Sequence, residues 1–104
     1  MPLPEITHLQ FLVLSLLGGE ELPGRAIREG LTAQGERKSG PAFYQFMARL
    51  EDAGLVDGWY DQKVVAGQII KERRYRVTGD GARACDEARN FYATAPARLS
   101  AGIA

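Results

Sequence analysis

Apolar residues recur at spacings of three and four in the segment SGPAFYQFMARLEDAGLV, residues 39–56. These spacings place them on one side of a helix and leave the opposite side for a partner. The apolar positions are Phe43, Phe46, Met47 and Leu50. Ser39 and Pro41 suit the start of such a helix, and Gly54 closes it.

Two runs rich in aromatic and β-branched residues follow, at residues 55–61 and 69–77. They flank a glycine-bearing stretch, residues 63–68, so the pattern predicts a β-hairpin with a loop at 63–68. Alternation divides the return strand into two faces. One face carries Lys71, Arg73, Tyr75 and Val77, of which Tyr75 and Val77 are expected to point to the core, and the other carries Arg74 and Arg76.

Two helices are predicted before residue 39. Thr7 and Gln10 form a capping-box pattern, so the first helix is expected from His8 to about Leu17. It is apolar on most sides, which marks it as an element that another surface must cover. The second helix is expected to begin near Pro23 and to stop at Gly35.

A last helix is expected from about Gly79 to Ala95, ended by Pro96 because a proline ring cannot continue the helical hydrogen-bond ladder. Its apolar stripe contains Ala82, Cys85, Ala88 and Tyr92. In so short a chain the stripe is expected to pack against a second copy, which makes these residues the predicted homodimer interface. Residues 1–95 are thus expected to form the domain, and residues 96–104 a loose tail.

This order of elements predicts an α+β winged helix-turn-helix with three helices, a two-stranded β-wing and a C-terminal dimerisation helix. The 104 residues suffice for one small domain. The longest apolar run, residues 11–17, is far shorter than the roughly 20 residues that cross a bilayer, so a soluble cytoplasmic protein is expected. No motif for catalysis is present, and neither an enzyme activity nor a cofactor is expected.

Charge permits DNA binding without identifying it. The chain has 13 basic and 13 acidic residues, but residues 36–76 hold eight basic and six acidic ones, a net charge of +2. Cys85 is the only cysteine, so no disulfide within the chain can form, and a single His does not support a zinc site. Cys85 is expected to be a packing residue rather than a redox sensor.

Three segments carry a resemblance: the residues 39–56 quoted above, GWYDQ at residues 58–62 and KERRYRVTGDG at residues 71–81. Together they resemble the PadR-like family of bacterial winged-helix transcriptional regulators. The resemblance implies a homodimer that binds double-stranded DNA, expected to be a repressor. Some family members bind flat aromatic compounds, which implies a small aromatic effector. The chain departs from the family at Gln45, where proline is usual, and at Arg74, where tyrosine is usual.

The predicted DNA-binding residues lie on the third helix and the wing. They are Lys38, Ser39, Ala42, Tyr44, Gln45, Arg49, Lys63, Lys71 and Arg73. Gln45 is the best candidate for reading a base, because an amide can pair bidentately with adenine. The resemblance makes Ser39 and Tyr44 phosphate contacts, and wing cations can lie along phosphates beside the minor groove.

Other interpretations of these residues stay open. Ser39 can be only a helix cap, and the charged side chains only a solvated face. Trp59 and Tyr60 can pack in the core, contact a second subunit or line an effector pocket. The whole domain can instead be a protein-interaction module without DNA binding, or a small-molecule sensor.

Overall fold

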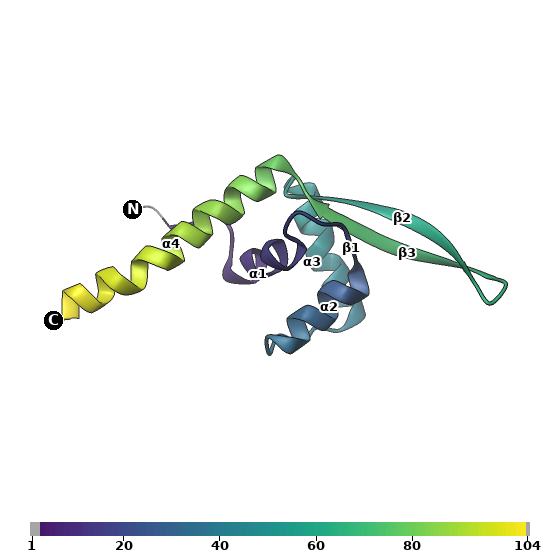
Figure 1. Cartoon of the computed structure of the whole chain (residues 1–104), viewed down its shortest axis with the longest axis horizontal. Coiled ribbons are helices and arrows are strands. Elements are labelled where there is room, and N and C mark those ends of the chain that lie inside the picture. Colours follow the sequence, from purple (N-terminus) through teal and green to yellow (C-terminus); the bar gives the residue numbers. More distant parts are fainter. Residues whose placement is uncertain (1–2, 104) are drawn as a thin grey trace.

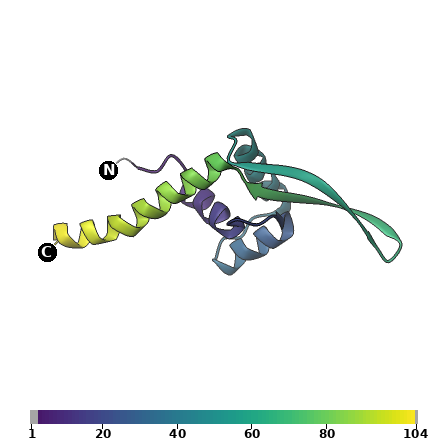
Figure 2. The ribbon, with the colours of Figure 1, turned by 45° about the horizontal axis from the view of Figure 1, so that its top comes forward.

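A helical body carries a long β-hairpin on one side and a long final helix on the other (Figures 1 and 2). The structure, a computed structural model, describes the backbone of residues 3–103 and the side chains of residues 3–94. Its elements are α1 (His8–Leu17), β1 (Leu22–Pro23), α2 (Gly24–Ala33), α3 (Gly40–Asp52), β2 (Val56–Val65), β3 (Gln68–Val77) and α4 (Gly79–Ile103). This order confirms the predicted α+β winged helix-turn-helix.

The helix α1 begins and ends where the sequence predicts. The Thr7 hydroxyl accepts a hydrogen bond from the Gln10 backbone N–H at 3.1 Å, and the Gln10 side chain accepts one from the Thr7 N–H at 2.9 Å. This reciprocal pair satisfies donors that the first turn leaves without helical partners. The core joins α1 to every other helix. It contains Ile6, Val13, Leu14, Leu17, Ile27, Leu31, Phe43, Met47, Leu50, Val56, Tyr75, Cys85 and Ala88.

The wing is longer than predicted, and a third strand supports it. Residues 63–65 and 68, expected in a loop, belong to the strands, and only Ala66 and Gly67 form the turn. Both have positive φ, 52° and 78°, as a two-residue turn that matches the twist of a hairpin requires. The sequence did not predict β1, which pairs with β3 through Leu22↔Tyr75 and Pro23↔Arg74. The sheet is antiparallel with order β1-β3-β2.

The predicted end of the last helix at Pro96 is wrong, because α4 continues to Ile103 and the expected loose tail is helical up to that residue. A proline within a helix removes one backbone donor, but the flanking residues Ala93, Ala95 and Ala97 are of the best helix-forming type. Along residues 3–103, no helix combines the length and the apolar character needed to cross a membrane.

The apolar stripe of α4 covers α1 of the same chain. Cys85 is 5% exposed and Ala88 0%, and the Cys85 Sγ atom lies 3.6 Å from the Ser15 Oγ atom of α1. The centre of the Tyr92 ring lies 5.3 Å from the centre of the Phe11 ring of α1. Ala82, in contrast, is exposed. The prediction that this stripe contacts a second subunit is therefore wrong for Cys85 and Ala88. The apolar α1 does need a cover, and the chain supplies it itself.

Candidate nucleic-acid interface

The helix α3 presents one polar face to solvent. The Ser39 hydroxyl caps it by accepting the Ala42 N–H at 3.2 Å, and Arg28 Nη2 of α2 donates to the carbonyl of Lys38 at 3.0 Å. These bonds fix the turn between α2 and α3. Phe43, Met47 and Leu50 anchor the inner face in the core. The outer face is left with Ala42, Gln45 and Arg49, all exposed.

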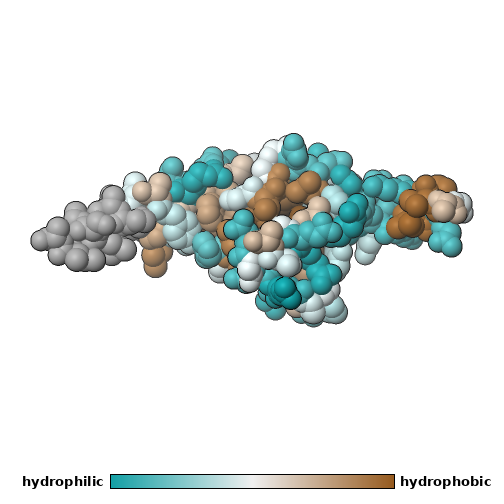
Figure 3. All heavy atoms as spheres, turned by 60° about the horizontal axis from the view of Figure 1, so that its bottom comes forward, coloured by the Kyte–Doolittle hydropathy of each residue, from teal (hydrophilic) through white to brown (hydrophobic). Residues whose placement is uncertain are grey.

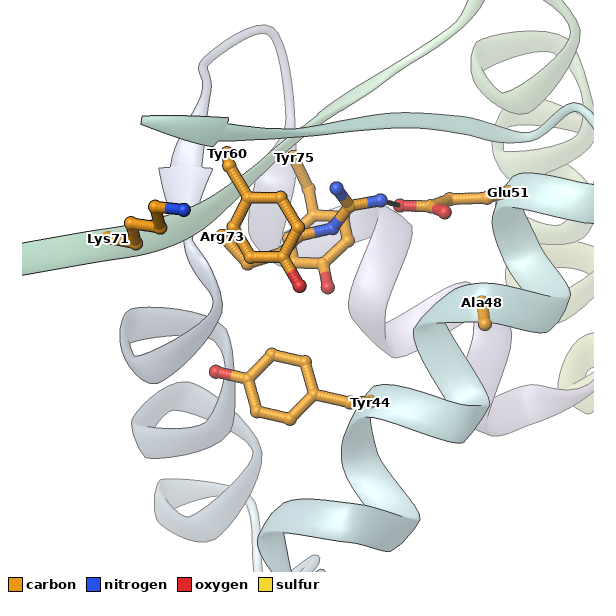
Figure 4. Close-up of a pocket in the computed structure, with 7 residues that line it drawn as sticks. All are labelled: Tyr44, Ala48, Glu51, Tyr60, Lys71, Arg73 and Tyr75. Carbon is orange, nitrogen blue, oxygen red and sulfur yellow. Dashed lines mark hydrogen bonds and ion pairs between the residues drawn. The ribbon is translucent and has the colours of Figure 1, made fainter. Parts of the chain in front are cut away.

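A cavity of about 430 Å³ opens between α3 and the wing (Figure 4). The helix contributes Tyr44, Ala48 and Glu51, the strand β2 contributes Tyr60, and β3 contributes Lys71, Arg73 and Tyr75. Alternate residues of β3 point to the same face of the sheet, which is why every second side chain from Lys71 to Tyr75 reaches the cavity. The cavity therefore gathers aromatic rings, hydroxyl groups and cations beside the exposed face of α3.

The guanidinium of Arg73 lies at the centre of this cavity. Its Nη2 donates to Glu51 Oε1 at 2.6 Å, and its Cζ atom lies 4.8 Å from the centre of the Tyr60 ring and 5.7 Å from that of Tyr75. Burial works against the charge, but the hydrogen bond to Glu51 raises the pKa of Arg73. The guanidinium therefore stays charged, and one of its five donor hydrogens is directed to Glu51.

Two glycines allow side chains of the cavity to take their positions. A β-carbon at Gly58 would collide with Glu51 Oε1. The Glu51 side chain can therefore pass over Gly58 to reach Arg73 only because this position is a glycine. A β-carbon at Gly24 would lie 3.0 Å from the Tyr44 hydroxyl oxygen. The Tyr44 ring also packs edge-on against Phe43 at 5.1 Å. The Tyr44 hydroxyl is thus held beside the first residue of α2.

Tyr75 contributes a hydroxyl that stays protonated. Its side chain is buried at 2% exposure, and burial raises its pKa to about 12, because the phenolate would lose its hydration. At neutral pH the cavity therefore holds a neutral phenol beside a charged guanidinium, with donors from both.

Glu72 joins the wing to α2 on the other face of the hairpin. Its Oε1 lies 2.9 Å from Arg25 Nε, and its Oε2 lies 3.2 Å from Lys63 Nζ and 3.5 Å from Arg74 Nη1. The contact with Lys63 lowers the pKa of Glu72, burial works against this, and the hydrogen bond from Arg25 lowers the pKa further. The stabilisation from this group is therefore present above its ordinary pKa of 4.5 and is lost as pH falls through its lowered value.

The structure brings together three of the predicted DNA-binding residues, Tyr44, Lys71 and Arg73. Lys63 does not join them, because its register partner is Ile70 and it points to the face with Glu72. Lys38 is half-buried, with its ammonium 5.2 Å from the centre of the Phe46 ring.

The predicted effector residues are not brought together either. Tyr60 lines the cavity, whereas Trp59 lies on the other face, 5.7 Å from the Arg76 guanidinium. Sequence reasoning missed Glu51 as a member of the site and assigned Tyr75 only to the core. The alternation of β3 was the available signal for Tyr75. Among the described side chains, no group of His, Cys, Asp or Glu is arranged to hold a metal ion.

This geometry defines a winged helix-turn-helix protein, and solved structures share it. A PadR family transcriptional regulator from Eggerthella lenta is 26% identical to this chain. The match covers 91% of this chain and 80% of the regulator, with a TM-score of 0.72. A PadR family transcription regulator from Clostridium difficile is 15% identical, with a TM-score of 0.77 over 94% of this chain and 100% of its own. Bacillus subtilis PadR, solved in complex with operator DNA, is 19% identical, with a TM-score of 0.62 over 78% of this chain and 47% of its own.

No family model and no curated protein sequence matches the chain. The solved structures nevertheless confirm the resemblance noted in the sequence: the chain has a PadR-like winged-helix fold. The neighbours from Eggerthella lenta and Clostridium difficile are described as transcriptional regulators.

Proposed function

We propose that the chain is a DNA-binding transcriptional regulator of PadR-like type. The observation that carries the proposal is the convergence of Tyr44, Lys71 and Arg73 in one cavity beside the exposed face of α3. A hydroxyl, an ammonium and a guanidinium are the groups that bind a phosphate of the DNA backbone. The Bacillus subtilis neighbour, solved with operator DNA, supports the same assignment.

In this arrangement the phosphate fixes the position of the protein and α3 reads the sequence. A docked backbone at the cavity directs the exposed side of α3 toward the major groove, which is wide enough to admit a helix. Gln45 and Arg49 are then one turn apart on the side facing the base edges, with the small Ala42 between them and the helix start. Gln45 suits adenine and Arg49 suits guanine.

The proposed regulator is a homodimer. Its two α3 helices are then related by a two-fold axis and read two half-sites. The surface for dimerisation must differ from the buried part of the α4 stripe. The α4 ribbon extends well past α1 (Figure 1), and Phe91 and Tyr92 are only partly buried before that extension. We place the dimer contact at Phe91 and Tyr92. Bound at a promoter, such a dimer represses by blocking the polymerase, and it acts in the cytoplasm, where the bacterial chromosome lies.

Selection from a pool of randomised duplexes tests the reading role of Gln45. We expect the parent protein to enrich a motif with two symmetric half-sites about one helical turn apart. Gln45→Ala should lose preference at one base pair of each half-site by about 1–3 kcal/mol, because the bidentate amide contact is gone. Folding should be unaffected, since Gln45 is exposed.

The matched control is Gln34→Ala, an exposed glutamine at the end of α2. It should leave the motif unchanged. An identical motif from Gln45→Ala would remove Gln45 as a reader. If the parent enriches no motif, the interaction-module alternative is favoured.

A further inference from the structure

The outer edge of β2 has no strand partner within the part of the chain that the structure describes. The sheet order is β1-β3-β2, so β2 is an edge strand over its whole length, Val56–Val65. An edge strand presents a row of backbone N–H and C=O groups with which another strand can pair. The hairpin reaches well past α1, α2 and α3 (Figures 1 and 2), so these helices leave the outer part of the edge open.

Exposed apolar side chains accompany this free edge. On β2 the exposed fractions are 69% for Tyr60, 74% for Val64 and 51% for Val65. Ile69 and Ile70 of β3 add to them, and Figure 3 shows the aliphatic members as an apolar patch at the far end of the hairpin. A long edge strand with an apolar surface is a site at which a further strand adds to the sheet.

The order of residues along β2 makes this edge complementary to itself. Residues 59–65 read WYDQKVV, which is two aromatic residues, an acid, an amide, a base and two β-branched residues. When two such strands run antiparallel about a two-fold axis at Gln62, each residue lies opposite one that is equally far from the axis. The opposite pairs are then Asp61 with Lys63, Tyr60 with Val64, and Trp59 with Val65.

These pairs have the geometry and the chemistry that stabilise an antiparallel ladder. A two-fold axis perpendicular to the sheet keeps each face on its own side. The members of each pair are an even number of residues apart, so alternation places them on the same face. Opposite charges, and an aromatic residue opposite a β-branched one, are favourable cross-strand pairs.

Charge selects this register over its neighbours. An axis at Asp61 or at Lys63 would place two like charges directly opposite each other, which destabilises a strand pair. Within one chain, Asp61 lies opposite Glu72, so two carboxylates are neighbours, and Lys63 lies 3.2 Å from Glu72. A lysine on an edge strand by itself opposes pairing. Opposite Asp61 of a second copy, Lys63 instead offsets the repulsion between the two carboxylates.

We propose that two copies of the chain pair edge to edge through β2, with the two-fold axis at Gln62, and form one six-stranded antiparallel sheet from their two three-stranded sheets. The partner is a second copy because the complementarity is that of β2 with itself. The contact is separate from the α4 contact of the proposed regulator and requires no DNA. A chain with both two-fold contacts assembles beyond a dimer.

Oxidative cross-linking tests the register. Gln62→Cys places two thiols opposite each other at the axis, and opposite Cα atoms of an antiparallel pair are about 4.5–5.5 Å apart, which suits a disulfide. Most of the chain should then become a covalent dimer. Gln68→Cys is the matched control, an exposed glutamine of the same wing that pairs with Val65. Its two copies would lie roughly 20 Å apart along the strands and should not cross-link. The parent, whose only cysteine is the buried Cys85, is the blank.

Exchange of charges tests the pairing without a cross-link. Asp61→Lys places lysines opposite each other, and Lys63→Asp places aspartates opposite each other. Each variant alone should associate through β2 about tenfold more weakly or worse, because the unfavourable pair occurs twice in the interface. An equimolar mixture should regain the parent's association, since lysines of one variant then face aspartates of the other. Sedimentation measures association. Emission from Trp59, the only tryptophan, should shift to shorter wavelength as Val65 of the second copy covers it.

Absence of a cross-link from Gln62→Cys overturns the pairing, and so does equal cross-linking by Gln68→Cys, which would reflect random collision. A mixture of the two charge variants that associates no better than its components also overturns it. Where Lys63→Asp disturbs the hairpin by losing Glu72, the cross-link decides, because Gln62→Cys changes no charge. Failure of the parent to bind any duplex, with the Gln62→Cys cross-link present, overturns the proposed function and leaves the β2 contact standing.

Discussion

Ala88→Glu should destabilise the fold itself, lowering the free energy of unfolding by about 3 kcal/mol or more. Ala88 is 0% exposed and lies in the core where α4 covers α1. A glutamate there must either carry an unpaired charge into an apolar contact or displace α4 from α1. A domain of this size has a total stability of roughly 5–15 kcal/mol, so the loss is a large part of it. Urea denaturation followed by circular dichroism measures the change.

The control is Ala82→Glu, on the same helix and in the same sequence stripe but exposed. It should change the unfolding free energy by no more than about 0.5 kcal/mol. The two variants separate cover of the chain's own α1 from contact with a second subunit. If Ala88→Glu weakens a dimer and leaves the monomer as stable as the parent, the stripe contacts a partner and the position of α4 described above is wrong.

Arg73→Ala should weaken binding to every duplex, specific or not, by roughly 10- to 100-fold. A hydrogen bond to a charged group contributes about 1.5–3 kcal/mol, and removing Arg73 leaves the Glu51 carboxylate facing the phosphate without its partner. Replacing both, as Arg73→Ala with Glu51→Gln, should therefore restore part of the affinity. Fluorescence anisotropy on a short labelled duplex measures all three proteins.

The exposed ion pair of Arg76 and Asp57 is the matched control, since it lies on the other face of the hairpin with its charged atoms 3.5 Å apart. Arg76→Ala, alone or with Asp57→Asn, should leave affinity within about twofold, because an exposed pair away from the docking face contributes little. Equal losses from Arg73→Ala and Arg76→Ala would mean that total charge, and not the cavity, drives binding.

Elements whose signal is local were predictable from the sequence. Thr7 and Gln10 lie three residues apart and locate the start of α1, and the spacing of Phe43, Met47 and Leu50 gives the inner face of α3. The strand β1 has only two residues, too few for a pattern, and forms because β3 offers it an edge.

Features that depend on long-range geometry were not predictable. Glu51 and Arg73 are 22 residues apart, and their contact depends on the register of the hairpin and on the missing side chain of Gly58. The stripe on α4 shows that a surface is covered, but a sequence pattern does not say whether the cover is the same chain or another. That is why Cys85 and Ala88 were assigned to a dimer contact and are found in the core.

The salt dependence of binding to a random-sequence duplex tests the central claim most directly. If the cavity and α3 form a DNA-docking face, the logarithm of the binding constant should fall linearly with the logarithm of salt concentration. Lys71→Ala should reduce the magnitude of this slope by about one for each protomer bound, while Arg76→Ala should leave it unchanged. Binding too weak to detect at low salt, or a slope that Lys71→Ala does not alter, would contradict the account.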